Sequence, residues 1–301
     1  MPDKTPRSGF VAVVGRPNAG KSTLLNTLLG QKVVIISDKP QTTRDRIRCI
    51  LTEERGQIIF IDTPGIHKPR RRLGEYMQTA ARGALDDADA ALLVADVSVP
   101  FGSGDEYLLA LTRESGLPLV LALNKTDLAR PADIAARIAF YAGQADFRDV
   151  VPISALKGDN TNVLPDALFP LLPPGPLFYD PGDVTDKTER FMAAEMIREK
   201  LLLLTREEIP HALAVVIEEM EEEQTLVRIK ALVLVEHESQ KGVVIGKKGA
   251  LLREAGALAR RDIEEMLGRK VYLQLWVKTR KNWRNSPAGL REAGYRLREL
   301  D

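Results

Sequence analysis

The feature that most constrains this chain is the run GRPNAGKS, which fits the pattern GxxxxGK[ST] in full. It follows an apolar segment and precedes a stretch with helical spacing of apolar residues. A glycine-rich turn in that place lets backbone N–H groups close around phosphate oxygens, and the helix N-terminus favours an anion. Lys21 is expected to reach the β- and γ-phosphates, and the Ser22 hydroxyl to ligate magnesium. The expected phosphate-binding residues are Gly15, Arg16, Pro17, Asn18, Ala19, Gly20, Lys21, Ser22 and Thr23.

Apolar runs alternate with helical patterns over the first half of the chain. Runs as continuous as LPLVLALN fit a parallel sheet that is covered on both faces. Strands that alternate with helices predict an α/β domain with a doubly wound, mostly parallel sheet. The expected strands are Phe10–Gly15, Ile47–Thr52, Ile58–Asp62, Ala91–Asp96, Leu117–Asn124 and Val150–Ile153.

Two further runs have the residues that a triphosphate and its metal need. DTPG ends a predicted strand, so Asp62 can hold magnesium through water and the Gly65 N–H can meet the γ-phosphate. QTTRDR lies between the first helix and the second strand, where Thr43 can complete the magnesium shell when GTP is bound. Alone, either run is typical of an ordinary surface turn. Their order after the phosphate loop is what favours a nucleotide site. The expected catalytic residues are Lys21, Thr43 and Gly65, the metal ligands are Ser22, Thr43 and Asp62, and Thr63 and Pro64 complete the contact set.

Base selection is expected at the run NKTD, which follows LPLVLALN. A carboxylate there accepts hydrogen bonds from two guanine N–H groups, and adenine has no such donor pair, so Asp127 selects guanine. Lys125 can pack its stem over the base, while Asn124 braces the loop. Ser154 and Ala155 follow the next strand and are placed to give backbone N–H groups to the guanine O6. Together the motifs predict a site for GTP and GDP.

Composition narrows the class of protein. Hydrophobic residues make up 44% and charged residues 28%, which excludes a disordered chain. No apolar run approaches the ~18 residues that span a bilayer, and the first ten residues do not resemble a secretory signal, so we expect a cytoplasmic protein. The single cysteine, Cys49, excludes an intrachain disulfide and a Cys-based zinc site, and the three dispersed histidines argue against a His-based one.

The composition shifts at LPPGPLFYDPGD, Leu172–Asp183, where proline and glycine block helix and central strand alike, so a linker is expected. Beyond it the charge is uneven although the whole chain has a net charge of +1. Residues Glu207–Glu238 have a net charge of −7, and Lys241–Arg298 have a net charge of +10. One interpretation is a face built for a polyanion; the other, equally weighted on charge alone, is a pair of solvated surfaces that balance each other.

A second phosphate-binding turn is predicted within the basic part. The run GKKG follows VVI and precedes a helical pattern, and in a KH module such a GxxG turn brings backbone N–H groups close to RNA phosphates. Alone it would read as a helix break with two solvated lysines. Its context is one helix, two strands near His211–Glu218 and Thr225–Val235, helical residues Lys248–Met266 and a third strand, Val271–Lys278. Of the two tryptophans, Trp276 is expected in the core and Trp283 at the surface. The expected RNA-binding residues are Ile245, Gly246, Lys247, Lys248 and Gly249.

The order GRPNAGKS, QTTRD, DTPG, NKTD and ISA resembles the translation-factor-like GTPases of the group that contains TrmE and Era. With the KH pattern, and with FMAAEMIREKL, LVEHESQKGVVIGKKG, YLQLWVK and LREAGY, the chain resembles the Era family from about Phe10 to its C-terminus. The resemblance implies a GTPase domain over residues 8–172, a linker over 173–187 and a type II KH domain over 188–301. A tRNA-modifying enzyme of the TrmE kind is the poorer fit, because no C-terminal Cys motif is present.

The Era resemblance implies a function as well as a fold. It implies a GTPase that uses GTP to control binding of the 3′ end of small-subunit ribosomal RNA and assists maturation of the small ribosomal subunit. It implies a monomer that binds no DNA, with loose attachment to the inner face of the cytoplasmic membrane. Ile66 stands where other GTPases have a catalytic glutamine, so slow hydrolysis by phosphate positioning is expected, and a non-catalytic RNA-binding scaffold stays an alternative. In similar GTPases an asparagine at the place of Asn18 ligates potassium.

Overall fold

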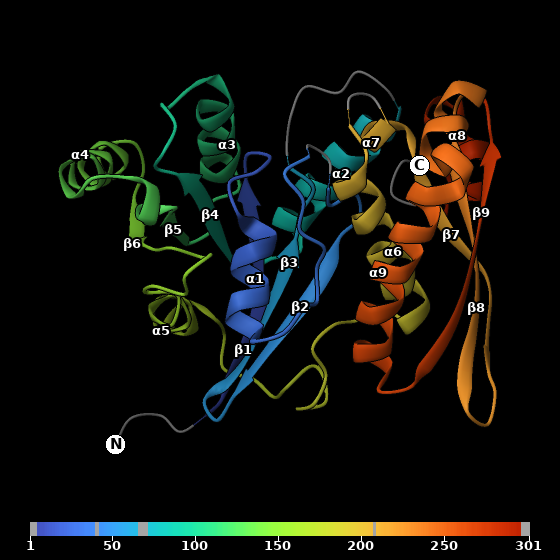
Figure 1. The fold of residues 1–301 in the computed structure, drawn as a ribbon. Coiled ribbons are helices and arrows are strands. Elements are labelled where there is room, and N and C mark those ends of the chain that lie inside the picture. Colours follow the sequence, from blue (N-terminus) through green and yellow to red (C-terminus); the bar gives the residue numbers. More distant parts are fainter. Residues whose placement is uncertain (1–4, 40–41, 66–71, 207–208, 296–301) are drawn as a thin grey trace. The chain divides into compact units, whose positions relative to one another are not determined.

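The computed structural model describes residues 5–39, 42–65, 72–206 and 209–295. The chain divides into two compact units (Figure 1). The first contains residues up to Val34, the stretch that begins at Thr43, and the stretch from Met77 to Asp186. The second contains Lys187 onward together with two short segments from the first half of the sequence, Ile35–Thr42 and one that ends at Tyr76.

The first unit is built on a six-stranded sheet in the order β2-β3-β1-β4-β5-β6. All neighbouring strands are parallel except β2 and β3, which form an antiparallel pair. The α/β fold class is therefore confirmed. The strands are β1 (Arg7–Gly15), β2 (Ile47–Glu53), β3 (Gly56–Asp62), β4 (Ala90–Asp96), β5 (Leu119–Asn124) and β6 (Phe147–Pro152).

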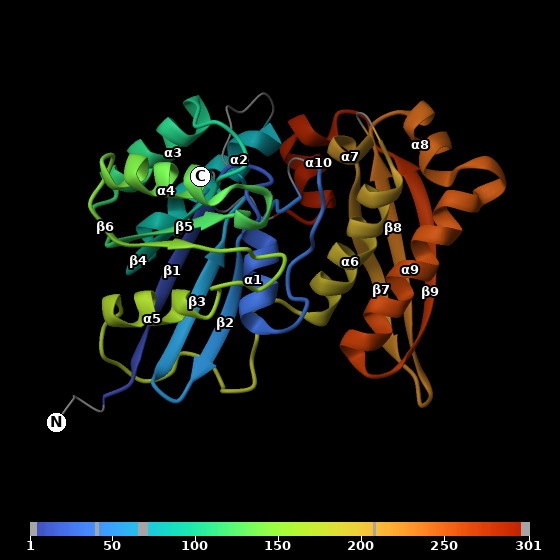
Figure 2. The ribbon, with the colours of Figure 1, turned by 60° about the vertical axis from the view of Figure 1, so that its left-hand side comes forward.

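Helices cover both faces of this sheet (Figure 2). On one face, Ala12 and Val14 of β1 pack with apolar residues of α2, α3 and α4, and on the other face lie α1 and α5. Because β1, β3 and β4 are buried on both faces, their sequences are continuously apolar rather than alternating. The helices are α1 (Lys21–Leu29), α2 (Arg72–Asp86), α3 (Ser103–Glu114), α4 (Pro131–Ala142) and α5 (Val163–Leu168).

The proline-rich residues expected as a linker pack against the first unit as far as Asp186. Gln57 of β3 is fully buried and holds them. Its Oε1 accepts from the backbone N–H groups of Phe178 and Tyr179, both at 3.0 Å, and its Nε2 donates to the Tyr179 carbonyl at 3.1 Å. One buried amide thus satisfies three backbone groups of a segment whose sequence forms neither helix nor ladder.

The second unit has the element order of a type II KH domain. The elements are α6 (Glu189–Leu204), α7 (Ile209–Ala212), β7 (Ala214–Glu222), β8 (Leu226–Val235), α8 (Glu238–Ile245), α9 (Ala250–Leu267), β9 (Lys270–Thr279) and α10 (Pro287–Glu292). The sheet order is β7-β8-β9, with β8 and β9 parallel. The strand expected from His211 begins at Ala214 instead, because Pro210 suits a first helical turn and α7 precedes the strand.

Helices α6 and α9 lie side by side on one face of the three-stranded sheet (Figure 2). Ala193 and Ile197 of α6 are four residues apart, as are Ala255, Ala259 and Ile263 of α9, so each set forms one buried stripe. Alternate residues of β8 complete this core. Among the described residues, no helix has both the length and the apolar character required to cross a membrane.

The expected roles of the two tryptophans are wrong. Trp283 is fully buried and its indole N–H donates to the Ala212 carbonyl at 2.9 Å, while Trp276 is 45% exposed. Trp276 lies on β9, which is an edge strand, and alternation there puts even-numbered residues on the face opposite the helices. Arg284, the next residue, is also buried and forms an ion pair with Glu236.

Replacing Gln57 by Leu tests how the proline-rich segment is held. The change keeps the buried volume and removes the hydrogen bonds to Phe178 and Tyr179, so we expect the free energy of unfolding to fall by about 1–3 kcal/mol. Limited proteolysis should cut faster near Tyr179. Gln78→Leu, at a residue that bonds a side chain at the surface, is the control and should change neither quantity. Unchanged stability and cleavage in the Gln57 variant would contradict this role.

Candidate nucleotide and RNA sites

The phosphate loop places a lysine in the interior at the carboxyl end of β1. Lys21 is 6% exposed, and its Nζ donates to the carbonyls of Gly15 at 3.0 Å and Arg16 at 3.3 Å. Burial lowers the pKa of Lys21, against the opposing effect of the Asp62 carboxylate. Gly20 has φ +97°, and a Cβ there would lie 2.2 Å from Asn124 Nδ2, so the loop requires glycine. The Gly15 and Arg16 carbonyls thus accept the hydrogen bonds that the ammonium group is expected to donate to phosphate oxygens.

The three expected metal ligands converge beside this lysine. Ser22 Oγ and Thr43 Oγ1 are 3.3 Å apart, and Thr43 Oγ1 donates to Asp62 Oδ2 at 3.1 Å. Burial raises the pKa of Asp62 to about 6, although Lys21 and the hydroxyl hydrogen bonds lower it in part. The second carboxylate oxygen of Asp62 is buried and has no hydrogen-bond partner. A cluster of hard oxygen atoms with one unsatisfied carboxylate oxygen fits magnesium and its bound water.

The DTPG run approaches the phosphate loop closely. Thr63 Oγ1 donates to the Val13 carbonyl at 2.7 Å, which fixes the run to β1. A Cβ on Gly65 would lie 2.9 Å from the Pro17 nitrogen, so glycine is what permits this approach. Ile66 and Gln41, which the motif interpretation also used, lie outside the described residues.

The expected base-binding residues share one hydrogen-bond network. Asn124 donates to the Ala19 carbonyl at 2.8 Å and accepts from the Ala155 N–H at 2.9 Å, so it joins the phosphate loop to the Ser154 turn. Ser154 Oγ donates to Asp127 Oδ1 at 2.7 Å and thereby orients the carboxylate. The backbone N–H of Ser154 already donates to the Asp159 carbonyl at 3.1 Å.

Sequence reasoning missed two contributions to this network. Lys125 pairs with Asp96 at 2.6 Å, and Asp96 ends β4 beside Asn124 in the parallel register. A carboxylate at the carboxyl end of a buried strand is the signal that was available. The second contribution is the Ser154 hydroxyl, because the sequence motif predicted a role only for the backbone N–H of Ser154.

The GKKG turn in the second unit has the backbone that such a turn needs. Gly246 and Gly249 have φ +73° and +76°, and a Cβ on Gly246 would lie 2.8 Å from Leu251 Cβ. Lys248 has φ +50°, and both lysine side chains are exposed. Helix α8 ends before the turn and α9 begins directly after it. Two exposed cations therefore lie within a tight turn just before a long helix, an arrangement suited to phosphate contact.

Two family models match this chain, one in each half of the sequence. Residues 10–125 match the family model of the 50S ribosome-binding GTPase, and residues 208–284 match that of the KH domain. The GTPase Era of Staphylococcus epidermidis is 48% identical over 290 residues, which is 96% of this chain and 97% of that protein. This chain belongs to the Era family of GTPases. Its cofactors are therefore GTP or GDP and Mg²⁺.

Two solved Era structures cover 97% of the chain with TM-scores of 0.93. One is a variant of Aquifex aeolicus Era bound to GDP and AlF4⁻, at 39% identity. The other, at 40% identity, is Era in complex with MgGDPNP and nucleotides 1506–1542 of 16S ribosomal RNA. All of each solved chain is covered, so the likeness extends over both units.

Asp127→Asn tests base selection. The Asn side chain can still accept from the Ser154 hydroxyl, so the fold should be retained, but one acceptor for the guanine N–H groups becomes a donor. We expect GTP affinity to fall by at least about 100-fold and xanthosine triphosphate to become the preferred ligand. Ser154→Ala should weaken GTP binding only several-fold and keep guanine preference. Equal competition by ATP and GTP for the unmodified protein, measured by calorimetry, would contradict the role of Asp127.

Proposed function

We propose that this GTPase uses GTP to control its binding to the 3′ end of small-subunit ribosomal RNA during assembly of the small ribosomal subunit. The observation that carries the proposal is the convergence of Ser22, Thr43 and Asp62 in a chain that also has the GKKG turn. The solved relative with MgGDPNP and a 16S ribosomal RNA segment supports the pairing of these two ligands.

In this proposal each nucleotide-site residue has one task. Lys21 neutralises the β- and γ-phosphates, the Gly65 N–H meets the γ-phosphate, and Thr43 completes the metal shell only while the γ-phosphate is present. Magnesium supplies charge neutralisation at the phosphates when it is bound. Ile66 has no group that orients water, so hydrolysis rests on positioning and charge, and we expect it to be slow. Release of phosphate then frees the loop that contains Thr43.

The RNA-binding task falls to Ile245–Gly249. Close backbone approach at the two glycines and the charges of Lys247 and Lys248 would hold the RNA backbone. As further parts of the proposal, the protein acts as a monomer in the cytoplasm, binds no DNA and attaches loosely to the inner face of the membrane. The family resemblance alone supports these last points.

Replacing Lys247 and Lys248 together by Asp tests the RNA site. Aspartate tolerates the positive φ of Lys248, and both glycines remain, so the turn should persist. We expect a large loss of affinity for the RNA, unchanged GTP binding, and a slope of log affinity against log salt that is shallower by about 1.4.

The control is the same reversal at Arg280 and Lys281, near the start of the C-terminal basic segment. Arg284 is omitted because it is buried against Glu236. Filter binding at several salt concentrations measures both variants. If the Arg280/Lys281 variant loses the RNA and the Lys247/Lys248 variant keeps it, the KH assignment is wrong.

A further test concerns potassium. Asn18 has φ +63°, a conformation that glycine adopts freely, so Asn18→Gly removes the side chain without backbone strain. If the Asn18 amide ligates potassium near the phosphates, hydrolysis should run several-fold faster in K⁺ than in Na⁺, and the variant should lose that difference. Phosphate release under multiple turnover measures it, and equal rates of the unmodified protein in both salts would remove potassium from the mechanism.

A further inference from the structure

The loop that leads to the metal-binding threonine is part of the second unit. Residues Ile35–Thr42 group with Lys187 onward, whereas Thr43, the next residue, groups with the first unit. Ile35 is buried in the apolar core of the second unit, together with Met192 and Met196 of α6. The peptide bond between Thr42 and Thr43 therefore joins the KH core to the magnesium site. This connection is covalent, so it holds in any arrangement of the two units.

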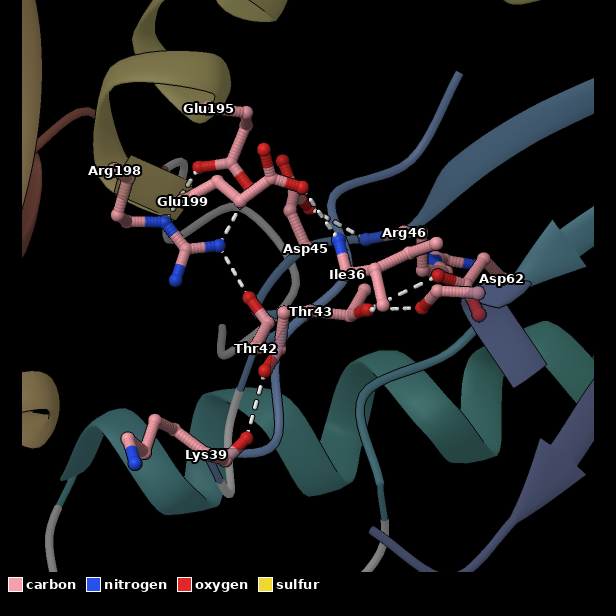
Figure 3. A network of polar contacts seen from close by, with 11 residues as sticks. Ile36, Lys39, Thr42, Thr43, Asp45, Arg46, Asp62, Glu195, Arg198 and Glu199 are labelled. Atoms are coloured by element: carbon pink, nitrogen blue, oxygen red, sulfur yellow. Dashed lines mark hydrogen bonds and ion pairs between the residues drawn. The ribbon is translucent and has the colours of Figure 1, made fainter. Parts of the chain in front are cut away.

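Helix α6 binds both ends of this segment (Figure 3). At one end, the Ile36 N–H donates to Glu199 Oε1 at 2.9 Å. At the other end, Arg198 donates from Nη2 to the Thr42 carbonyl. Arg198 and Glu199 are 1% and 3% exposed, so each contact has one charged partner held out of water, where it is worth more than at the surface. Arg198 thus holds Thr42, and Glu199, the next residue of the helix, holds Ile36.

Other residues of the helix fix the two anchors. Glu195, one turn earlier, accepts from Arg198 Nε at 2.7 Å and from Nη2 at 2.5 Å, which sets the plane of the guanidinium group. Glu199 also accepts from Lys200 at 2.9 Å, and Lys200 pairs with Asp262 at 2.6 Å. Asp262 lies on α9, the helix that begins directly after the GKKG turn. Glu199 is therefore linked, through Lys200, to the helix that follows the expected RNA site.

The described residues between the two anchors also bond to one another. Thr42 Oγ1 donates to the Lys39 carbonyl at 2.7 Å (Figure 3). The Lys39 N–H donates to Ser37 Oγ at 3.1 Å. Thr43 follows Thr42 directly and donates to Asp62 at 3.1 Å. We therefore expect a displacement of α6 that moves the Thr42 carbonyl to shift Thr43 relative to Asp62.

We propose that Arg198 and Glu199 are positioning residues for Thr43. Through them the RNA-binding unit controls the position of Thr43 at the metal site, and the nucleotide state in turn controls the affinity for RNA. The inference rests on the proposed role of Thr43 in magnesium binding. The residues act through the loop and touch neither nucleotide nor RNA. By linkage, the factor by which a GTP analogue tightens RNA binding relative to GDP measures this coupling, and such factors are typically about 5–150.

The test compares Arg198→Met with the double variant E195Q/R198M, which avoids leaving a carboxylate beside an apolar side chain. The readouts are kcat and KM for GTP and the RNA-affinity ratio between the GDPNP and GDP states, with a synthetic RNA of nucleotides 1506–1542 of 16S ribosomal RNA as probe. We expect kcat to fall about tenfold, KM to change less than about twofold, and the affinity ratio to fall to about one. Arg198→Lys can still donate to the Thr42 carbonyl and should restore part of the ratio.

The control is Arg190→Met. Arg190 lies on the same helix and donates to the carbonyls of Ile217 and Glu218, away from the loop, so its removal should leave the affinity ratio unchanged. An equal loss in that variant would show general loosening of α6 and overturn the inference. Thr43→Ala separates the two proposals. If it lowers kcat while E195Q/R198M matches the unmodified protein in every readout, the positioning inference fails and the metal role stands. If Thr43→Ala has no effect, the metal role fails and the inference fails with it.

Discussion

The structure depends on two opposite charges buried at the carboxyl edge of one sheet. Lys21 and Asp62 are almost completely removed from water, burial lowers the pKa of Lys21 and raises that of Asp62, and one Asp62 oxygen has no hydrogen-bond partner. The fold leaves the Asp62 carboxylate without its full set of partners, and burying a charge in that state costs free energy. In the proposed function, magnesium and its bound water would supply the missing partner. We therefore expect nucleotide binding to stabilise the arrangement of the loops around it.

The second consequence concerns where those loops go. A parallel sheet brings its connections to one edge, which places the phosphate loop, DTPG and NKTD close together. The connection between α1 and β2 differs, because its residues Ile35–Thr42 pack with the KH core. Thr43, the residue proposed to respond to the γ-phosphate, is thus joined by one peptide bond to the unit that contains GKKG. This gives the proposed control of RNA binding a physical route.

The convergence of the phosphate loop, DTPG and NKTD could be predicted from sequence, because each motif is local and its neighbours in the fold are strands with strong apolar patterns. Lys21, Ser22 and Asp62 needed only spacing and strand ends. The errors arose where tertiary packing decides. Trp276 alternates with apolar residues, but β9 is an edge strand with one uncovered face, whereas Trp283 is buried by contacts distant in sequence.

The same limit hid the contacts of α6 and β3. Arg198 and Glu199 belong to no motif that assigns them a contact, and only their hydrogen bonds to Thr42 and Ile36 show what they do. Gln57 in a buried strand gave no sign that it would bond a proline-rich segment more than a hundred residues later in the chain.

The most direct test of the account is the affinity of GDPNP and of GDP, each measured by calorimetry with the 16S ribosomal RNA segment absent and at saturation. Coupling between two sites is reciprocal, so if GTP favours the RNA-bound state, RNA must favour GTP to the same extent. The account predicts that RNA tightens GDPNP relative to GDP by a factor between about 5 and 150. A factor of one, with RNA bound equally well in both states, would contradict it.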